Sequence, residues 1–298
     1  MPYSSYVIRE SIRRANTIYL SDNYIPMLPT TLIDRATLCK GEYKLANSYY
    51  FEISSDFQIV RQWFEKTIIK NSAQLSYEKA NKIINSGSAD NFALRETLIN
   101  LNNVSDIISG MYSGSALYMA LKEKRLNVSM NIVGSSVSEK IVNNAMMLTN
   151  NRIAEFFYNH RFPFIYRVHQ INKEKQEEIM ELASQMMSEF SSSDFDRIYE
   201  IIRDNYPLAS YALAGSHEGL RLNHYTHATS PLRRGADIVA TECLNRCYFG
   251  NPTKAELENL KQELSNVVPS INETVERTSM FVWDYERNRK LLRKQLHL

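Results

Sequence analysis

The sequence has few of the residues that break helices or build disulfide frameworks. Nine glycines and eight prolines in 298 residues amount to about half the usual share, which argues against collagen-like, low-complexity and turn-rich sandwich chains. There are three cysteines, Cys39, Cys243 and Cys247, an odd set that favours neither a disulfide scaffold nor a zinc ribbon. We therefore expect long helices and a reducing compartment.

Long apolar runs and an excess of charge are also missing. No run of 18 apolar residues occurs, and the first 16 residues hold no apolar stretch of the signal-peptide kind, so we expect a soluble, cytoplasmic protein without membrane contact. Lysine and arginine number 35 against 33 acidic residues, a net charge of +2. Any site for a polyanion must therefore be a local arrangement of cations.

Hydrophobic periodicity predicts an α+β chain that is poor in strands. Residues 46–55 alternate, with Tyr49, Phe51 and Ile53 on one face, which is typical of a half-buried strand, and residues 17–20 are a second short candidate. From residue 57 onward the spacing becomes helical. The clearest helical runs are Ile179, Leu182, Ala183, Met186 and Phe190, and Val137, Ile141, Ala145 and Leu148.

Two capping signals support this division. Ser136 with Glu139, and Thr253 with Glu256, have the spacing of capping boxes immediately before apolar-periodic runs. Each pair predicts the first turn of a helix.

The helix that begins near residue 253 is expected to end at Pro269, and a further long helix carrying Trp283 is expected over residues 272–298. The loop-like segment 191–196 is too short to separate domains. We therefore expect one domain over residues 1–298, in which a small mixed sheet from the N-terminal part packs against many helices.

The sequence HYTHATSPLRRGAD, which begins at residue 224, carries the clearest chemistry. Ser230 and Pro231 form a helix start, which places Arg233 and Arg234 in a first turn that already carries partial positive charge. A bound phosphate would resolve this conflict, because backbone N–H groups and forked guanidinium groups both favour it. The alternative is that both arginines pair with Asp237 and solvent.

Extended to GSHEGLRLNHYTHATSPLRRGAD, this segment resembles the signature of the RNB family, the ribonuclease II/R type of 3′-to-5′ exoribonucleases. The chain is similar to the family, in the family's order, from about residue 8 to its end. The other similar blocks are RANTIYLSDNYIPMLPTTL at 14–32, LSYEKANKII at 75–84, AMMLTNNRIA with IYRVH within 145–169, and VERT at 275–278. The resemblance implies an RNB-type α+β fold.

The resemblance also implies roles for single residues. Tyr19 would stack on the base at the RNA 3′ end, Arg233 would contact the phosphate of the scissile region, and Glu276 would lie beside that site. The RNA-binding segment would comprise Tyr225, Thr229, Ser230, Arg233 and Arg234. The alternatives are that Tyr19 is a core aromatic residue and Glu276 a surface residue of a helix.

Hydrolysis in this family depends on a block of four aspartates that holds Mg²⁺, and we expect the chain to begin after that block. Asp194 with Asp196, and Asp284 with Glu286, are the best local acidic pairs, and each is explained as a solvated face. We therefore expect no metal site and no cofactor in this chain, with Mg²⁺ only if another chain supplies the carboxylates.

Histidines do not change this expectation. His169, His217, His224 and His227 lack metal-ligand spacing, so we interpret them as packing or RNA-contact residues.

Four positions depart from the family pattern within the matching blocks. Gly235 stands where the family has Tyr, Ala228 where it has Phe, Thr241 where it has His, and Asn144 where it has Glu. The pattern suggests a retained scaffold with eroded chemistry.

Three hypotheses follow: an incomplete exoribonuclease completed by another chain, an RNA-binding pseudonuclease, and an assembly subunit. The oligonucleotide-binding domains that flank the family's catalytic domain are also expected to be absent from this chain, so its own RNA affinity should depend strongly on salt. We expect single-stranded RNA as a ligand and a protein partner or a homo-oligomer, because sheet edges and apolar surface left without their neighbouring segment tend to bind partners.

Overall fold

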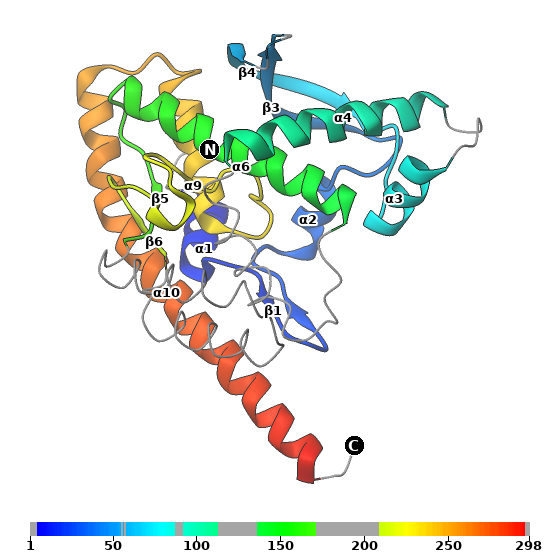
Figure 1. Ribbon diagram of the computed structural model, residues 1–298. Helices are drawn as coiled ribbons and strands as arrows, with labels where there is room; N and C mark the ends of the chain where they lie inside the picture. The colour runs from blue at the N-terminus through cyan, green and yellow to red at the C-terminus, as the bar shows by residue number, and fades with distance from the viewer. Residues whose placement is uncertain are drawn as a thin grey trace, which may run out of the picture. The chain divides into compact units, whose positions relative to one another are not determined.

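The computed structural model describes residues 5–112, 136–170 and 209–295, apart from 55, 57 and 87–91. The α+β class expected from the sequence is confirmed (Figure 1). In place of the expected mixed sheet, the described strands form three separate antiparallel pairs. The described residues form two compact units, the first from residues 5–27, 150–170 and 209–295 and the second from residues 28–112 and 136–149. No helix in these ranges is both long enough and apolar enough to cross a membrane.

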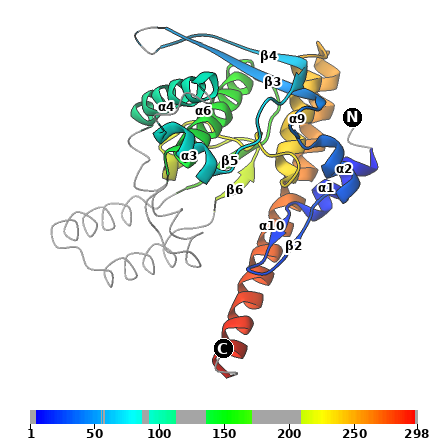
Figure 2. The ribbon, with the colours of Figure 1, turned by 90° about the vertical axis from the view of Figure 1, so that its right-hand side faces the viewer.

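The first unit is built around three helices, α1 (Tyr6–Arg14), α9 (Gly235–Cys247) and α10 (Lys254–Gln295), with α1 packed on both of the others. Two short antiparallel pairs of strands belong to the same unit (Figure 2). These pairs are β1 (Ile18–Tyr19) with β2 (Tyr24–Ile25), and β5 (Tyr166–Val168) with β6 (Ser210–Ala212). A 3₁₀ turn, Glu218–Leu220, follows β6.

The second unit contains a long β-hairpin and the helices α2 (Thr30–Ala36), α3 (Tyr77–Asn85) and α4 (Phe92–Met111). The hairpin pairs β3 (Tyr43–Ile53) with β4 (Ile59–Lys70). The helix α6 (Val137–Asn159) contributes residues to both units.

The strand expected at 46–55 is confirmed in β3, which ends at Ile53, and the one expected at 17–20 is confirmed in β1, which covers only Ile18–Tyr19. The expectation of helix from residue 57 onward is wrong for residues 59–70, which form β4. Cross-strand aromatic pairs explain this strand: Tyr49 stacks on Phe64 at 4.3 Å between ring centroids, and Tyr50 on Trp63 at 5.0 Å. Pairing with an aromatic partner strand therefore overrides the local pattern.

Both capping boxes are confirmed. The Ser136 backbone N–H donates to Glu139 Oε2 at 2.8 Å, and the Thr253 N–H donates to Glu256 Oε2 at 2.8 Å. The helical run that begins at Val137 lies in α6, as expected. The run at 179–190 and the segment 191–196 lie outside the described residues.

The expected end at Pro269 is wrong, because α10 continues through it to Gln295 and includes the separate helix expected over 272–298. Pro269 is exposed, whereas Val268 and Ile271 on either side of it are buried. The buried stripe of α10, which includes Leu260 and Leu264, thus continues past the proline and holds the helix against the core.

Candidate functional site

The segment around Ser230 forms a tight turn that precedes α9. The N–H groups of Arg233 and Arg234 both donate to the Ser230 carbonyl, at 3.2 and 3.1 Å, and the helix begins only at Gly235. The expected helix start at Ser230 and Pro231 is therefore wrong, and the two arginines lie before the helix instead of in its first turn. The reason is that Arg234 is extended, with φ −136° and ψ 124°, and bridges to Asn16.

The end of α1 holds this turn in place. The Gly235 N–H donates to the Ala15 carbonyl at 2.6 Å, and the Thr17 N–H donates to the Arg233 carbonyl at 2.9 Å. A Cβ atom at Gly235 would lie 2.5 Å from the Ser11 carbonyl oxygen, so only glycine allows this approach. Backbone contacts from the start of the chain thus fix a loop more than 200 residues away.

The Asp237 carboxylate contacts two polar groups of the turn. Arg234 forms an ion pair with its carboxylate: Nη2 donates to Oδ1 at 2.8 Å, whereas Nε lies 2.8 Å from Oδ2 without a hydrogen bond between them. The Ser230 N–H donates to Oδ1 at 2.6 Å. Asp237 is fully buried in the first turn of α9, where the helix dipole favours a carboxylate. Burial raises the pKa of Asp237, and the charge of Arg234 opposes that rise.

The two arginines of the turn therefore differ in role. Burial disfavours the charged form of Arg234, but the Asp237 carboxylate outweighs it and raises the pKa of the guanidinium. Arg233 is exposed, and its Nη2 lies 3.3 Å from Ser230 Oγ. Arg234 therefore pairs with Asp237, as the alternative interpretation of the sequence expected. The guanidinium of Arg233 remains accessible to an anion.

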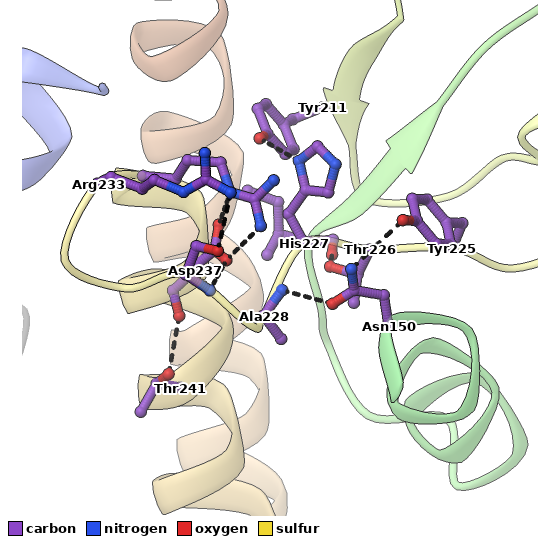
Figure 3. A network of polar contacts seen from close by, with 12 residues as sticks. Asn150, Tyr211, Tyr225, Thr226, His227, Ala228, Arg233, Asp237 and Thr241 are labelled. Atoms are coloured by element: carbon purple, nitrogen blue, oxygen red, sulfur yellow. Dashed lines mark hydrogen bonds and ion pairs between the residues drawn. The ribbon is translucent and has the colours of Figure 1, made fainter. Parts of the chain in front are cut away.

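A buried network supports the turn from the side of α6 (Figure 3). Asn150 donates from Nδ2 to the Tyr225 hydroxyl at 3.3 Å, and its Oδ1 accepts from the Ala228 N–H at 3.0 Å. Thr226 Oγ1 donates to the Ile165 carbonyl at 2.7 Å. Sequence reasoning missed Asn150, and its only signal was its place in the AMMLTNNRIA block.

Above the turn in Figure 3, the Tyr211 hydroxyl and His227 Nδ1 share a hydrogen bond of 2.8 Å. The guanidinium of Arg167 lies over the Tyr211 ring, 4.6 Å from its centroid. Burial raises the pKa of Tyr211 to about 12, so its phenol stays protonated at neutral pH. The hydroxyl can then hold His227 in place.

The other expected site residues have varied environments. Tyr19 is 57% exposed and stacks on Tyr24, with ring centroids 6.3 Å apart, so it is not a core residue. Tyr225 is buried, and Thr229 Oγ1 is buried without a hydrogen-bond partner. Glu276 is exposed on α10, and among the described residues no hydrogen bond or ion pair connects it to the turn.

Three of the four departures from the family pattern have side-chain or backbone-space roles of their own in this chain, whereas Ala228 contributes only its backbone N–H, which most other residues would also supply. Gly235 admits the end of α1. Thr241 Oγ1 donates to the Asp237 carbonyl at 2.8 Å. In the second unit, Asn144 Nδ2 donates to the Ser105 carbonyl at 2.9 Å.

The residues around the turn do not fit Mg²⁺, which needs at least one accessible carboxylate among its oxygen ligands. Both oxygens of Asp237 already face Arg234, and within the described ranges no three His, Cys, Asp or Glu side chains gather as a metal site would require. Of the acidic pairs, Glu286 accepts from the Ser21 N–H and hydroxyl, both at 2.8 Å, and Asp284 is exposed. Residues 194 and 196 lie outside the described part.

The histidines pack against aromatic rings. His169 and His217 are buried, with ring centroids 5.3 Å apart, and His224 stacks on Tyr158 at 3.8 Å.

Comparison with known proteins agrees with this architecture. Ribonuclease R 2 of Lactococcus lactis is 26% identical over 86% of this chain and 44% of its own length. The structure of Mycoplasma genitalium RNase R with ribose-methylated single-stranded RNA superimposes with a TM-score of 0.79 at 21% identity, over 99% of this chain and 52% of that one.

Yeast Ssd1, described as a pseudonuclease, superimposes with a TM-score of 0.74 at 19% identity, over 93% of this chain and 38% of that one. The chain spans less than half the length of the first curated relatives that it matches. The RNB domain model matches residues 1–250, and the chain therefore belongs to the RNB family.

Proposed function

We propose that this chain is an RNB-type domain that binds single-stranded RNA at the turn Ser230–Arg234 and that its own residues do not hydrolyse the strand. One observation carries the proposal: the Asp237 carboxylate is taken up by Arg234 and Ser230, while Arg233 stays exposed. The turn thus offers a cation to a phosphate, but the buried acid beside it, Asp237, is already paired with Arg234.

Tyr19 offers a place for a base, and a backbone hydrogen bond ties its strand to the turn. Tyr19 is exposed on β1, two residues after Thr17, whose N–H binds the Arg233 carbonyl. An exposed aromatic ring can stack on any base, and such a stack typically contributes about 1–3 kcal/mol. Binding through one guanidinium and one ring should be tolerant of sequence and sensitive to salt.

The relatives support this assignment at the level of the family. The curated relatives are ribonucleases, the Mycoplasma genitalium protein was solved with single-stranded RNA, and yeast Ssd1 is described as a pseudonuclease of similar fold. RNA binding and loss of cleavage therefore both occur among proteins that resemble this one.

Fluorescence anisotropy with a twelve-nucleotide adenosine RNA, carrying a dye in place of a 5′ phosphate, tests binding. Arg233→Ala should weaken binding about tenfold and reduce the slope of log K against log salt by roughly 0.7, the value for one phosphate contact on a single strand. Arg35→Ala, which removes another exposed arginine, from α2, is the matched control and should change neither. Equal effects of the two variants would refute the assignment of Arg233.

A second assay tests whether the chain cleaves RNA. The same RNA is incubated with the chain and Mg²⁺ and its length is followed on a gel. We expect the strand to stay intact. Release of nucleotides by the purified chain, lost in Arg233→Ala, would show that the site cuts and would overturn the second half of the proposal.

The expected protein partner or homo-oligomer stays a prediction, which light scattering of the purified chain can check.

A further inference from the structure

The first unit contains a cavity of about 780 Å³ that the RNA-binding turn does not use. Its walls come from the end of α6 and the chain that follows it, from the loop after β6, and from one residue of α10. None of Ser230, Arg233 and Arg234 lines it. The volume falls within the range of small-molecule pockets, roughly 300–1,000 Å³.

The lining is rich in flat aromatic surfaces. Phe157 and Phe164 are buried and stack on each other, with centroids 3.8 Å apart and 12° between their planes. Tyr158 is 57% exposed and stacks on His224 at 3.8 Å and 24°. Phe162 lies on the same wall. Phe157 and Phe164 are almost completely buried and form the back of the wall, so the exposed ring of Tyr158 is the surface on which a planar aromatic ligand can stack.

The charge of the lining has one sign. Arg161 and Lys261 are both exposed, and no aspartate or glutamate is among the residues that the structure describes as lining the cavity. A ligand with an anionic group is therefore favoured over a neutral or cationic one.

Arg161 lies at the C-terminal end of α6. Its N–H donates to the Tyr158 carbonyl and the Phe162 N–H donates to the Phe157 carbonyl, both at 3.0 Å, which is a Schellman motif ending α6. Arg161 has φ +56°, a left-handed conformation that glycine adopts easily and that other residues disfavour. A glycine at this position would therefore remove the Arg161 side chain without straining the backbone.

From these observations we propose that the cavity binds a nucleotide-like ligand, with a nucleobase against the aromatic wall and a phosphate monoester at Arg161 and Lys261. This chemistry has two sources, a free nucleoside monophosphate and the phosphorylated end of an RNA strand. The site is separate in its residues from the RNA-binding turn and does not depend on it.

Isothermal titration calorimetry with adenosine 5′-monophosphate tests the proposal on the full chain. We expect saturable binding, with weaker binding of adenosine, which lacks the phosphate, and of ribose 5-phosphate, which lacks the base. Arg161→Gly suits the left-handed backbone while removing the cation, so it should fold at least as well and bind about tenfold more weakly. Lys261→Gln should weaken binding in the same direction.

The chain supplies a matched control. Arg221 is also exposed and left-handed, with φ +53°, and does not line the cavity. Arg221→Gly makes the same chemical change elsewhere and should leave the affinity for adenosine 5′-monophosphate unaltered. Equal weakening by Arg161→Gly and Arg221→Gly would overturn the assignment, as would the absence of saturable binding to the unmodified chain.

A hexaribonucleotide with a 5′ phosphate separates the two sources. Tighter binding of this strand than of adenosine 5′-monophosphate, lost in Arg161→Gly, assigns the pocket to a strand end; binding of the mononucleotide at equal or higher affinity assigns it to the free nucleotide. Because the test of Arg233 uses RNA without a 5′ phosphate, failure of one proposal is not failure of the other.

Discussion

Replacement of Asp237 by alanine should unfold the first unit at much lower denaturant concentration. Asp237 is fully buried, and its carboxylate faces the Arg234 guanidinium at two contacts of 2.8 Å each. The Arg234 side chain is only 20% exposed, so removal of the carboxylate leaves a cation that water reaches poorly. Breaking a buried pair from one side is far more costly than removing the pair as a whole.

The magnitude follows from two losses. An uncompensated buried partner of an ion pair typically costs about 3–5 kcal/mol. The Ser230 N–H, which donates to Oδ1 at 2.6 Å, also loses its acceptor, which costs about 1–3 kcal/mol when no water replaces it. Partial exposure of Arg234 reduces the first loss, so we expect a decrease of about 4 kcal/mol in the free energy of unfolding.

Urea denaturation followed by circular dichroism measures this decrease, with Asp284→Ala on the exposed face of α10 as the control. A double-mutant cycle makes the test specific: Arg234→Ala with Asp237→Ala should cost clearly less than the sum of the two single variants. A stable Asp237→Ala protein, or additive losses in the cycle, would refute the view that Asp237 serves Arg234. It would also reopen a role for Asp237 as a catalytic acid or a metal ligand.

The sequence correctly predicted those helix starts and strands that depend on residues close to one another along the chain. The capping boxes at residues 136 and 253 formed because each needs only residues three positions apart. The strand at 46–55 and the helical run from Val137 follow from their own periodicity. The family was recognised for a related reason, since its motif blocks are short and contiguous.

Features fixed by distant residues could not be predicted in this way. Residues 59–70 became a strand because β3 pairs with them, and α10 passed Pro269 because its buried stripe continues beyond it. Arg234 is extended because Asn16, more than 200 residues away, bridges to it. The cavity beside Arg161 likewise joins segments whose proximity exists only in the fold.

Four further variants test single features of the structure. Gly235→Ala places a Cβ 2.5 Å from the Ser11 carbonyl oxygen and should lower the free energy of unfolding by about 1–3 kcal/mol. Gly110→Ala, whose added Cβ would have nothing within 4 Å, should raise the free energy of unfolding by about 0.5–1 kcal/mol. Thermal melts measure both changes. Thr253→Ala removes the cap of α10 and should cost about 1 kcal/mol, with faster amide exchange confined to its first turn. Burial raises the pKa of Tyr211 to about 12 against 10 in an unfolded chain, so between these values the folded state binds more protons and its stability falls as pH rises, by roughly 2–3 kcal/mol in total. Tyr211→Phe should remove this share of the alkaline loss in urea titrations at pH 9 to 12, and an unchanged pH dependence would show that the phenol is not buried as described.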